Sequence, residues 1–246
     1  MNRRQKKETY TIYKMNDQPI LIHGDNHGSW DRLFKKIEDA DITDCILIGV
    51  GDTGIGFKTN EKQLREIEFL NNRFKKRNIK YMTIRGNHCD PTYFFGTVKL
   101  SNFELIPDYT YRELNGETFL FVGGAISIDR KMRTLNSSYW KDEVFVLKPE
   151  LVKKCDVLIA HTAPYWIGPF DKEGLSGWCT KDVHLWDECE KERKDLDELV
   201  KLCQPSRSYH GHFHTSAWVD FRECFARILD IDEIVEHKQI SKMTVS

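Results

Sequence analysis

Five short segments of the chain place histidine, aspartate or asparagine beside small residues, in an order that could build a metal centre. They are GDNHG, GDTG, GNH, AHTAP and GHFH, which begin at Gly24, Gly51, Gly86, Ala160 and Gly211. Carboxylate, amide and imidazole groups of this kind bind divalent cations such as manganese, iron and zinc. We therefore expect the segments to hold two adjacent divalent metals. The candidate ligands are Asp25, His27, Asp52, Asn87, His161, His212 and His214.

The spacing within these segments supports metal binding. Asp25 and His27 are two residues apart, and alternate side chains of an extended segment point to the same side, so both could bind one metal. Asp52 offers two carboxylate oxygens and could bridge two ions, whereas Asn87 adds an oxygen without adding charge. His88 remains outside the ligand set, and an imidazole with a pKa near neutrality suits proton donation to a leaving alkoxide.

Each segment also has an ordinary structural interpretation. Taken alone, GDNHG and GDTG are rich in turn-forming residues, and a single histidine at a strand end is more often structural than a ligand. All five together, in this order and nearly all at strand ends, favour one shared site. The remaining histidines are expected to be structural, although His210 lies two residues before His212 and strict alternation could aim it at the site. These histidines are His23, His184, His210 and His237.

Apolar runs predict a strand immediately before each of the first three segments, at residues 19–23, 45–50 and 81–84. Helical spacing of apolar residues predicts a helix in each gap, the first capped by Ser29. The first helix would bury Trp30, Leu33, Phe34 and Ile37, and the second would bury Leu64, Ile67, Leu70 and Phe74. Strands that alternate with helices indicate an α/β fold with a largely parallel sheet. The site would then lie beyond the carboxyl ends of its strands.

The rest of the chain is richer in predicted strands, at residues 104–106, 110–113, 118–122 and 157–160 and twice within 217–229. Asn115-Gly116 is typical of a hairpin turn. Residues 165–203 have the character of an insertion or lid, with tryptophans in the first part and a charged helix in the second. We expect one domain over residues 1–246, preceded by a flexible tail at residues 1–8.

The composition restricts the setting and the partners. The chain has 246 residues, 40% of them hydrophobic, and a formal net charge of −1. This charge gives no bulk attraction to nucleic acid or to an anionic membrane, and no segment has the length of a membrane span. Seven cysteines without a CxxC pair favour a reducing compartment, so we expect a cytoplasmic protein.

The ordered segments resemble those of the calcineurin-like metallophosphoesterases over Asp25 to His214, and RGNHCDPTYF with GGAISIDR is similar to small bacterial or phage members. The resemblance implies a four-layer α-β-β-α sandwich, in which helices flank two mixed β-sheets. It also implies how the ligands divide between the metals. The first metal would be held by Asp25, His27, Asp52 and His214. The second would be held by Asp52, Asn87, His161 and His212.

The chain departs from the family pattern around His88. Many members carry GDxxD and GNHD or GNHE, but Ile55 and Cys89 occupy the acidic positions here and Asp90 comes one residue late. A carboxylate that holds a histidine fixes its tautomer and pKa. We therefore hypothesise that Asp90 orients His88 from a displaced position. The arginine of the GDxxDRG element of protein serine/threonine phosphatases is also absent.

These features predict a phosphoesterase in which a hydroxide that bridges two metals attacks phosphorus in line, with His88 protonating the leaving oxygen. Asn87 and an arginine (Arg85, Arg130 or Arg133) would contact the substrate, which could be a phosphorylated small molecule, a nucleotide or a phosphoprotein. Rings in residues 165–186 could stack on a base, as in a nucleotide or nucleic-acid phosphodiesterase, but rings of this kind more often pack a lid or core. A non-catalytic scaffold is the remaining alternative.

Overall fold

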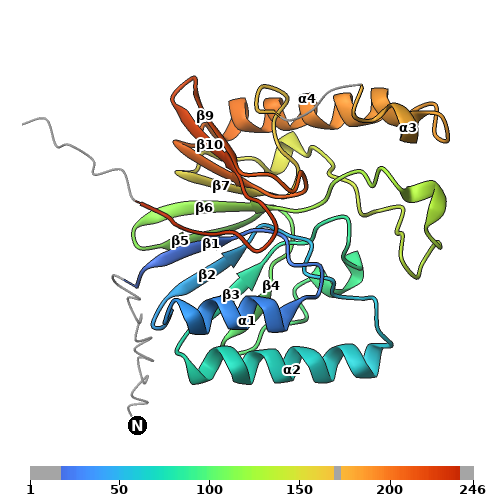
Figure 1. Ribbon diagram of the computed structural model, residues 1–246. Coiled ribbons are helices and arrows are strands. Elements are labelled where there is room, and N and C mark those ends of the chain that lie inside the picture. Colours follow the sequence, from blue (N-terminus) through green and yellow to red (C-terminus); the bar gives the residue numbers. More distant parts are fainter. Residues whose placement is uncertain (1–17, 169–172, 239–246) are drawn as a thin grey trace, which may run out of the picture.

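Two mixed β-sheets pack face to face, and helices cover both outer faces (Figure 1). This computed structural model describes residues 18–168 and 173–238, so the expected tail at residues 1–8 lies outside them. Because helices cover both outer faces of the packed sheets, the predicted four-layer α-β-β-α sandwich is confirmed. Within the described ranges, no helix has the length and apolar character needed to cross a membrane.

The first sheet contains the three strands that precede the first three motifs. Its order is β11-β1-β2-β3-β4, with β1 to β4 parallel and β11 antiparallel to β1. The strands are β1 (Ile20–His23), β2 (Ile46–Gly49), β3 (Lys80–Thr83), β4 (Phe103–Leu105) and β11 (Ile234–Glu236). The register places His23 beside Gly49 and Gly49 beside Thr83. The carboxyl ends of β1, β2 and β3 are therefore level, and the motifs that follow them start at one edge.

The second sheet carries the last two motifs. Its order is β5-β6-β7-β8-β10-β9, with four parallel central strands and an antiparallel strand at each edge. The strands are β5 (Thr110–Leu114), β6 (Glu117–Val122), β7 (Val157–Ala160), β8 (Arg207–His210), β9 (Ala217–Phe221) and β10 (Cys224–Ile228). The predicted turn at Asn115-Gly116 joins β5 to β6, with φ of 49° and 80°, as a hairpin of this type requires.

Helices α1 (Trp30–Asp39) and α2 (Asn60–Lys76) cover the first sheet. All four apolar residues predicted for the inner face of α1 are buried. In α2 the prediction is wrong at one position, because Leu64 is 42% exposed and Gln63 is buried. The side-chain oxygen Oε1 of Gln63 accepts the Gly56 N–H at 2.8 Å. This hydrogen bond to the neighbouring loop accounts for the inward position of Gln63.

Helix α4 (Leu185–Cys203) covers the second sheet and forms the fourth layer (Figure 1). It buries Leu196, Leu199 and Cys203 against that sheet. The segment expected to be an insertion at residues 165–203 therefore has two parts, an irregular part with the short helix α3 (Ser176–Cys179) and the layer helix itself. The sequence analysis did not predict β11 or the 3-10 helices Pro91–Phe94, Arg130–Met132 and Pro149–Leu151.

Candidate metal centre

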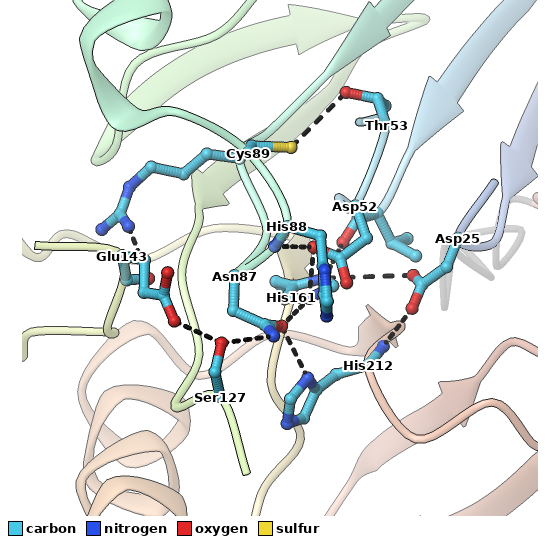
Figure 2. A network of polar contacts seen from close by, with 12 residues as sticks. Asp25, Asp52, Thr53, Asn87, His88, Cys89, Ser127, Glu143, His161 and His212 are labelled. Carbon is cyan, nitrogen blue, oxygen red and sulfur yellow. Dashed lines mark hydrogen bonds and ion pairs between the residues drawn. The ribbon is translucent and has the colours of Figure 1, made fainter. Parts of the chain in front are cut away.

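The loops after β1, β2, β3, β7 and β8 meet where the two sheets adjoin, and their polar side chains converge there (Figure 2). Every one of these strands ends at a motif singled out from the sequence. The apolar strands β2 and β7 are buried on both faces, and β1 is buried at all but one residue. Burial fixes these strands and directs their loops to the same edge.

Four of the candidate ligands form a compact first group. Asp25, His27, Asp52 and His214 each offer one ligand atom, and these atoms lie within 4.8 Å of one another. The Nε2 atoms of His27 and His214 are 2.9 Å apart. His214 Nε2 lies 3.5 Å from Asp25 Oδ2, and His27 Nε2 lies 3.9 Å from Asp52 Oδ2.

A second group shares Asp52 with the first. The Oδ1 atom of Asn87 lies 2.9 Å from His212 Nδ1 and 3.0 Å from His161 Nε2. His161 Nε2 in turn lies 3.3 Å from Asp52 Oδ1. The two oxygens of Asp52 therefore face different groups, Oδ2 toward His27 and Oδ1 toward His161.

The donor atoms of both groups suit divalent cations. The buried Asp25 Oδ1 accepts no hydrogen bond from the described part of the chain, although a buried carboxylate oxygen normally has a partner. His161 Nδ1 donates to the Val50 carbonyl at 2.8 Å, so in the neutral ring the lone pair lies on Nε2, which faces Asn87 and Asp52. A second-shell hydrogen bond of this kind fixes the orientation of metal-binding histidines.

The backbone at these residues is unusual. His27, Asp52, His212 and His214 all have positive φ, between 46° and 69°, a region that non-glycine residues seldom occupy and that clusters at functional sites. Two glycines make room for the carboxylates. A Cβ atom at Gly86 would lie 2.0 Å from Asp52 Oδ1, and one at Gly211 would lie 2.1 Å from Asp25 Oδ1.

Burial and neighbouring charges shift the pKa values of three side chains in the cluster. Burial alone would raise the pKa of Asp52, but His161, His88 and His27 together hold it well below its usual range. Burial opposes the charged form of His161, yet Asp52 and Asp25 raise its pKa to about 9. Burial, reinforced by His161, lowers the pKa of His212 to about 3. The ionised Asp52 carboxylate favours a cation at this position, and a cation that binds His161 would displace the proton from its ring.

Comparison with protein families matches residues 18–216 to the model of the calcineurin-like phosphoesterases. The chain belongs to this family. The match covers all five motifs, and the family consists of metal-dependent phosphoester hydrolases that act on phosphorylated substrates. A comparison with curated proteins gave no match.

In this family member, His88 lies beside the candidate ligands without joining either group. Its backbone N–H donates to Asp52 Oδ1 at 2.6 Å. Its ring meets the His27 ring edge-on at a centroid distance of 5.0 Å and stacks on Phe57 at 6.4 Å. Burial lowers the pKa of His88, Asp52 opposes that shift, and Arg133 adds to it. The sequence analysis did not single out Phe57, because one aromatic residue in a loop gives no pattern.

The two positions where many calcineurin-like phosphoesterases carry acids are apolar here. Ile55 and Cys89 are both fully buried in the core beneath α1 and α2. Cys89 Sγ lies 3.5 Å from Thr53 Oγ1 (Figure 2), and burial raises the pKa of its thiol to about 11. Apolar packing therefore surrounds both positions in this chain.

Asp90 caps a short helix and does not form the hypothesised hydrogen bond to His88. Asp90 Oδ1 accepts the backbone N–H of Thr92 at 2.9 Å and its hydroxyl at 2.8 Å, and so caps the 3-10 helix Pro91–Phe94. Among the described residues, no hydrogen bond joins Asp90 to His88. Asparagine caps a helix about as well as aspartate, whereas alanine does not.

We therefore predict that Asp90→Asn leaves both kcat and stability unchanged. Asp90→Ala should lower the free energy of unfolding by about 1 kcal/mol through loss of the cap, with kcat retained. Urea unfolding and a pH profile of kcat check this pair of variants. A change in the acid limb of the profile for Asp90→Asn would restore the orienting role.

Two of the three candidate arginines are committed to structural contacts. Every N–H of the Arg85 guanidinium donates to Asp108 or to the carbonyls of residues 142–144. Arg130 pairs with Asp182 and Glu188. Neither guanidinium forms one of these bonds to a candidate ligand, whereas Arg133 donates to the backbone carbonyl of Asn87 at 3.2 Å. Of the three, Arg133 alone has a hydrogen bond to a candidate ligand.

A chain of buried hydrogen bonds fixes the amide of Asn87 (Figure 2). Asn87 Nδ2 donates to Ser127 Oγ at 2.9 Å, and the Ser127 hydroxyl donates to Glu143. Arg133 also donates to Ser127 Oγ, so this hydroxyl accepts two bonds and gives one. The carboxyl of Glu143 is fully buried, and burial raises its pKa to about 7. With Nδ2 committed to Ser127, Asn87 Oδ1 must face the second group.

Removal of the Ser127 hydroxyl should therefore weaken metal binding. In Ser127→Ala the Asn87 amide loses its acceptor and can turn Nδ2 toward the cations, so we expect metal affinity to fall about 10–100-fold. Competition with a chelator of known affinity measures this change. Ser101→Ala, at an exposed serine, is the matched control. Equal affinity of the two variants would contradict the orienting role.

The histidines expected to be structural lie outside both groups. His210 was the least secure, but its Nδ1 donates to the Thr162 carbonyl at 2.8 Å and its Nε2 lies 3.0 Å from Ser208 Oγ. His23 lies beside Asp232, and His237 pairs with Glu117. His184 is exposed at the start of α4.

Proposed function

We propose that this calcineurin-like phosphoesterase hydrolyses phosphate mono- or diesters with two divalent cations, which can be manganese, iron or zinc. The observation that carries the proposal is the Asp52 carboxylate, whose two oxygens face two separate groups of donors. One cation would be held by Asp25, His27, Asp52 and His214. The other would be held by Asp52, Asn87, His161 and His212.

When bound, two such cations supply a nucleophile from water near neutral pH and offset charge on the phosphoryl oxygens. The chain's own residues would hold the two cations in adjacent positions. Asp52 contributes to both groups, and the His161 and Asn87 side chains are locked by Val50 and Ser127. Such preorganised groups lose little free energy in rearranging as the reaction proceeds.

In this proposal His88 delivers a proton to the leaving oxygen, and its position at a cavity supports that role. A cavity of about 480 Å³ opens beside the candidate ligands. His88 lines this cavity together with Asp52, Asn87, His212 and His214. An ester seated there would have its phosphoryl group at the donor atoms and His88 within reach, the geometry that general acid catalysis needs.

The test combines metal analysis with turnover. We expect two equivalents of metal per chain after reconstitution, and hydrolysis of p-nitrophenyl phosphate or of its bis ester. The ratio of the two rates assigns mono- or diesterase activity. Two bound metals without hydrolysis of either ester would instead support a non-catalytic scaffold.

We also propose a reducing compartment such as the cytoplasm. All seven cysteines are free thiols, and six of them are buried. Disulfides are rare in reducing compartments. Export to an oxidising compartment in cell fractionation would contradict this setting.

A further inference from the structure

The cavity beside the candidate ligands continues beneath the segment that joins β7 to α4. Its apolar lining includes Ile128, Leu175 and Trp178, which we call the far wall, and Phe213, which lies between the candidate ligands His212 and His214. None of these residues belongs to the two ligand groups, and two of them come from the irregular part of the connection around α3. The cavity thus has a polar end at the ligands and an apolar end below α3.

Trp178 is fixed in this wall. It packs with Ile128, Val144 and Cys179 against the buried residues Ile126, Leu185 and Cys189. The Trp178 side chain is half-buried. It contacts the core, has Lys181 Nζ 5.9 Å from its ring centroid, and also lines the cavity. A ring held in this way presents an apolar surface without ordering a mobile side chain on binding.

The charges around the cavity disfavour a second anionic group. Beyond the candidate ligands and His88, its ionisable residues are Asp129, Glu192 and Arg193. The Arg193 guanidinium donates to the carbonyls of Ala163, Pro164 and Ile167. The positive charge therefore serves mainly to hold that loop, and none of the described lysines lines the cavity.

Glu192 adds an acceptor to the wall. Its carboxyl accepts the backbone N–H groups of Ile126 and Phe145, each at 3.2 Å. It lies in the cavity wall with only 6% of the residue exposed. An anionic substituent at this end would meet carboxyl oxygens, whereas an uncharged ring with an N–H or O–H group would find an acceptor.

We propose that the far wall binds an uncharged aromatic ring of the substrate, which rests on Trp178. This inference rests on the proposed function and specifies its substrate class as an ester of one phosphoryl group with a ring-bearing alcohol. Polyphosphates and esters flanked by carboxylates would be poor substrates, because their additional charge would meet an apolar or acidic surface.

The test compares two phosphonates that differ only in the organic group. We expect the metal-loaded protein to bind phenylphosphonate at least about tenfold more tightly than methylphosphonate in calorimetric titrations, as stacking on an aromatic side chain allows. Trp178→Ala should lose most of this preference without weakening methylphosphonate binding. Trp178→Phe should keep most of the preference. Trp218→Ala, at a tryptophan that is 67% exposed on β9, is the matched control.

The outcomes separate this inference from the proposed function. Equal affinity for the two phosphonates would overturn the ring site, as would an equal loss of both affinities in Trp178→Ala. In either case ester hydrolysis would still stand. If neither phosphonate binds and neither nitrophenyl ester is hydrolysed, the proposed function fails and the ring site fails with it.

Discussion

Replacement of His88 with asparagine is expected to lower kcat by about 10²–10⁴-fold for esters with poor leaving groups. Both metals should remain bound, because the His88 side chain belongs to neither ligand group. Its link to the centre is the backbone N–H that donates to Asp52, and the substitution preserves that donor. The loss should therefore fall on proton delivery and not on assembly of the site.

The leaving group provides the decisive measurement. Phenolate accepts a proton as it departs, whereas p-nitrophenolate leaves readily without one, so the loss should be large for phenyl phosphate and small for p-nitrophenyl phosphate. His184→Asn, at an exposed histidine, should leave kcat unchanged for both esters. An equal loss for both esters, or fewer than two metals per chain, would contradict the role of His88 as general acid.

Much of the arrangement around this histidine could be predicted from the sequence, because it depends on continuous apolar runs. Residues 45–50 and 157–160 are apolar throughout and become β2 and β7, buried on both faces. Parallel strands end at one edge of a sheet, so motifs far apart in the chain were expected to meet. The helical spacing of the apolar residues around Phe34 likewise predicted which face of α1 is buried.

The supports of the ligands could not be predicted in this way. Ser127 and Glu143 lie in irregular segments 40 and 16 residues from their hydrogen-bond partners Asn87 and Ser127. Serine and glutamate are common in loops, and no periodicity connects them. Only the folded chain shows that Ser127 and Glu143 join in a buried chain of hydrogen bonds that ends at Asn87. The same limit explains the missed strand β11, which has three residues and pairs with β1 at the edge of the first sheet.

Asp90 shows a different kind of limit. The family pattern drew attention to its distance from His88, whereas its local sequence, Asp-Pro-Thr, is typical of a helix start with proline at the first position. The structure follows the local signal. Similarly, the charged character of α4 did not indicate that Glu192 and Arg193 are buried and bind the backbone of neighbouring loops.

Replacement of Asp52 with asparagine should have the largest effect of any single change in the centre. Each oxygen of Asp52 faces a different group of donors, and an amide nitrogen at either position would repel a cation. The side chain is 1% exposed, so water has little access to replace the lost oxygen. We expect fewer than two metals per chain. Loss of several kcal/mol of charge stabilisation corresponds to a decrease of about 10³-fold or more in kcat.

Metal analysis of Asp52→Asn alongside His88→Asn divides the centre into its two tasks. Asp39→Asn, at an exposed carboxylate on α1, controls for the loss of one negative charge. If Asp52 joins the two metals, its variant loses metal and activity together for every leaving group, whereas the His88 variant keeps its metals and loses activity only where a proton is needed. The Asp52→Asn variant could instead keep two metals and full turnover. That result would show that the two donor groups operate independently and that Asp52 is not needed to join the two metals.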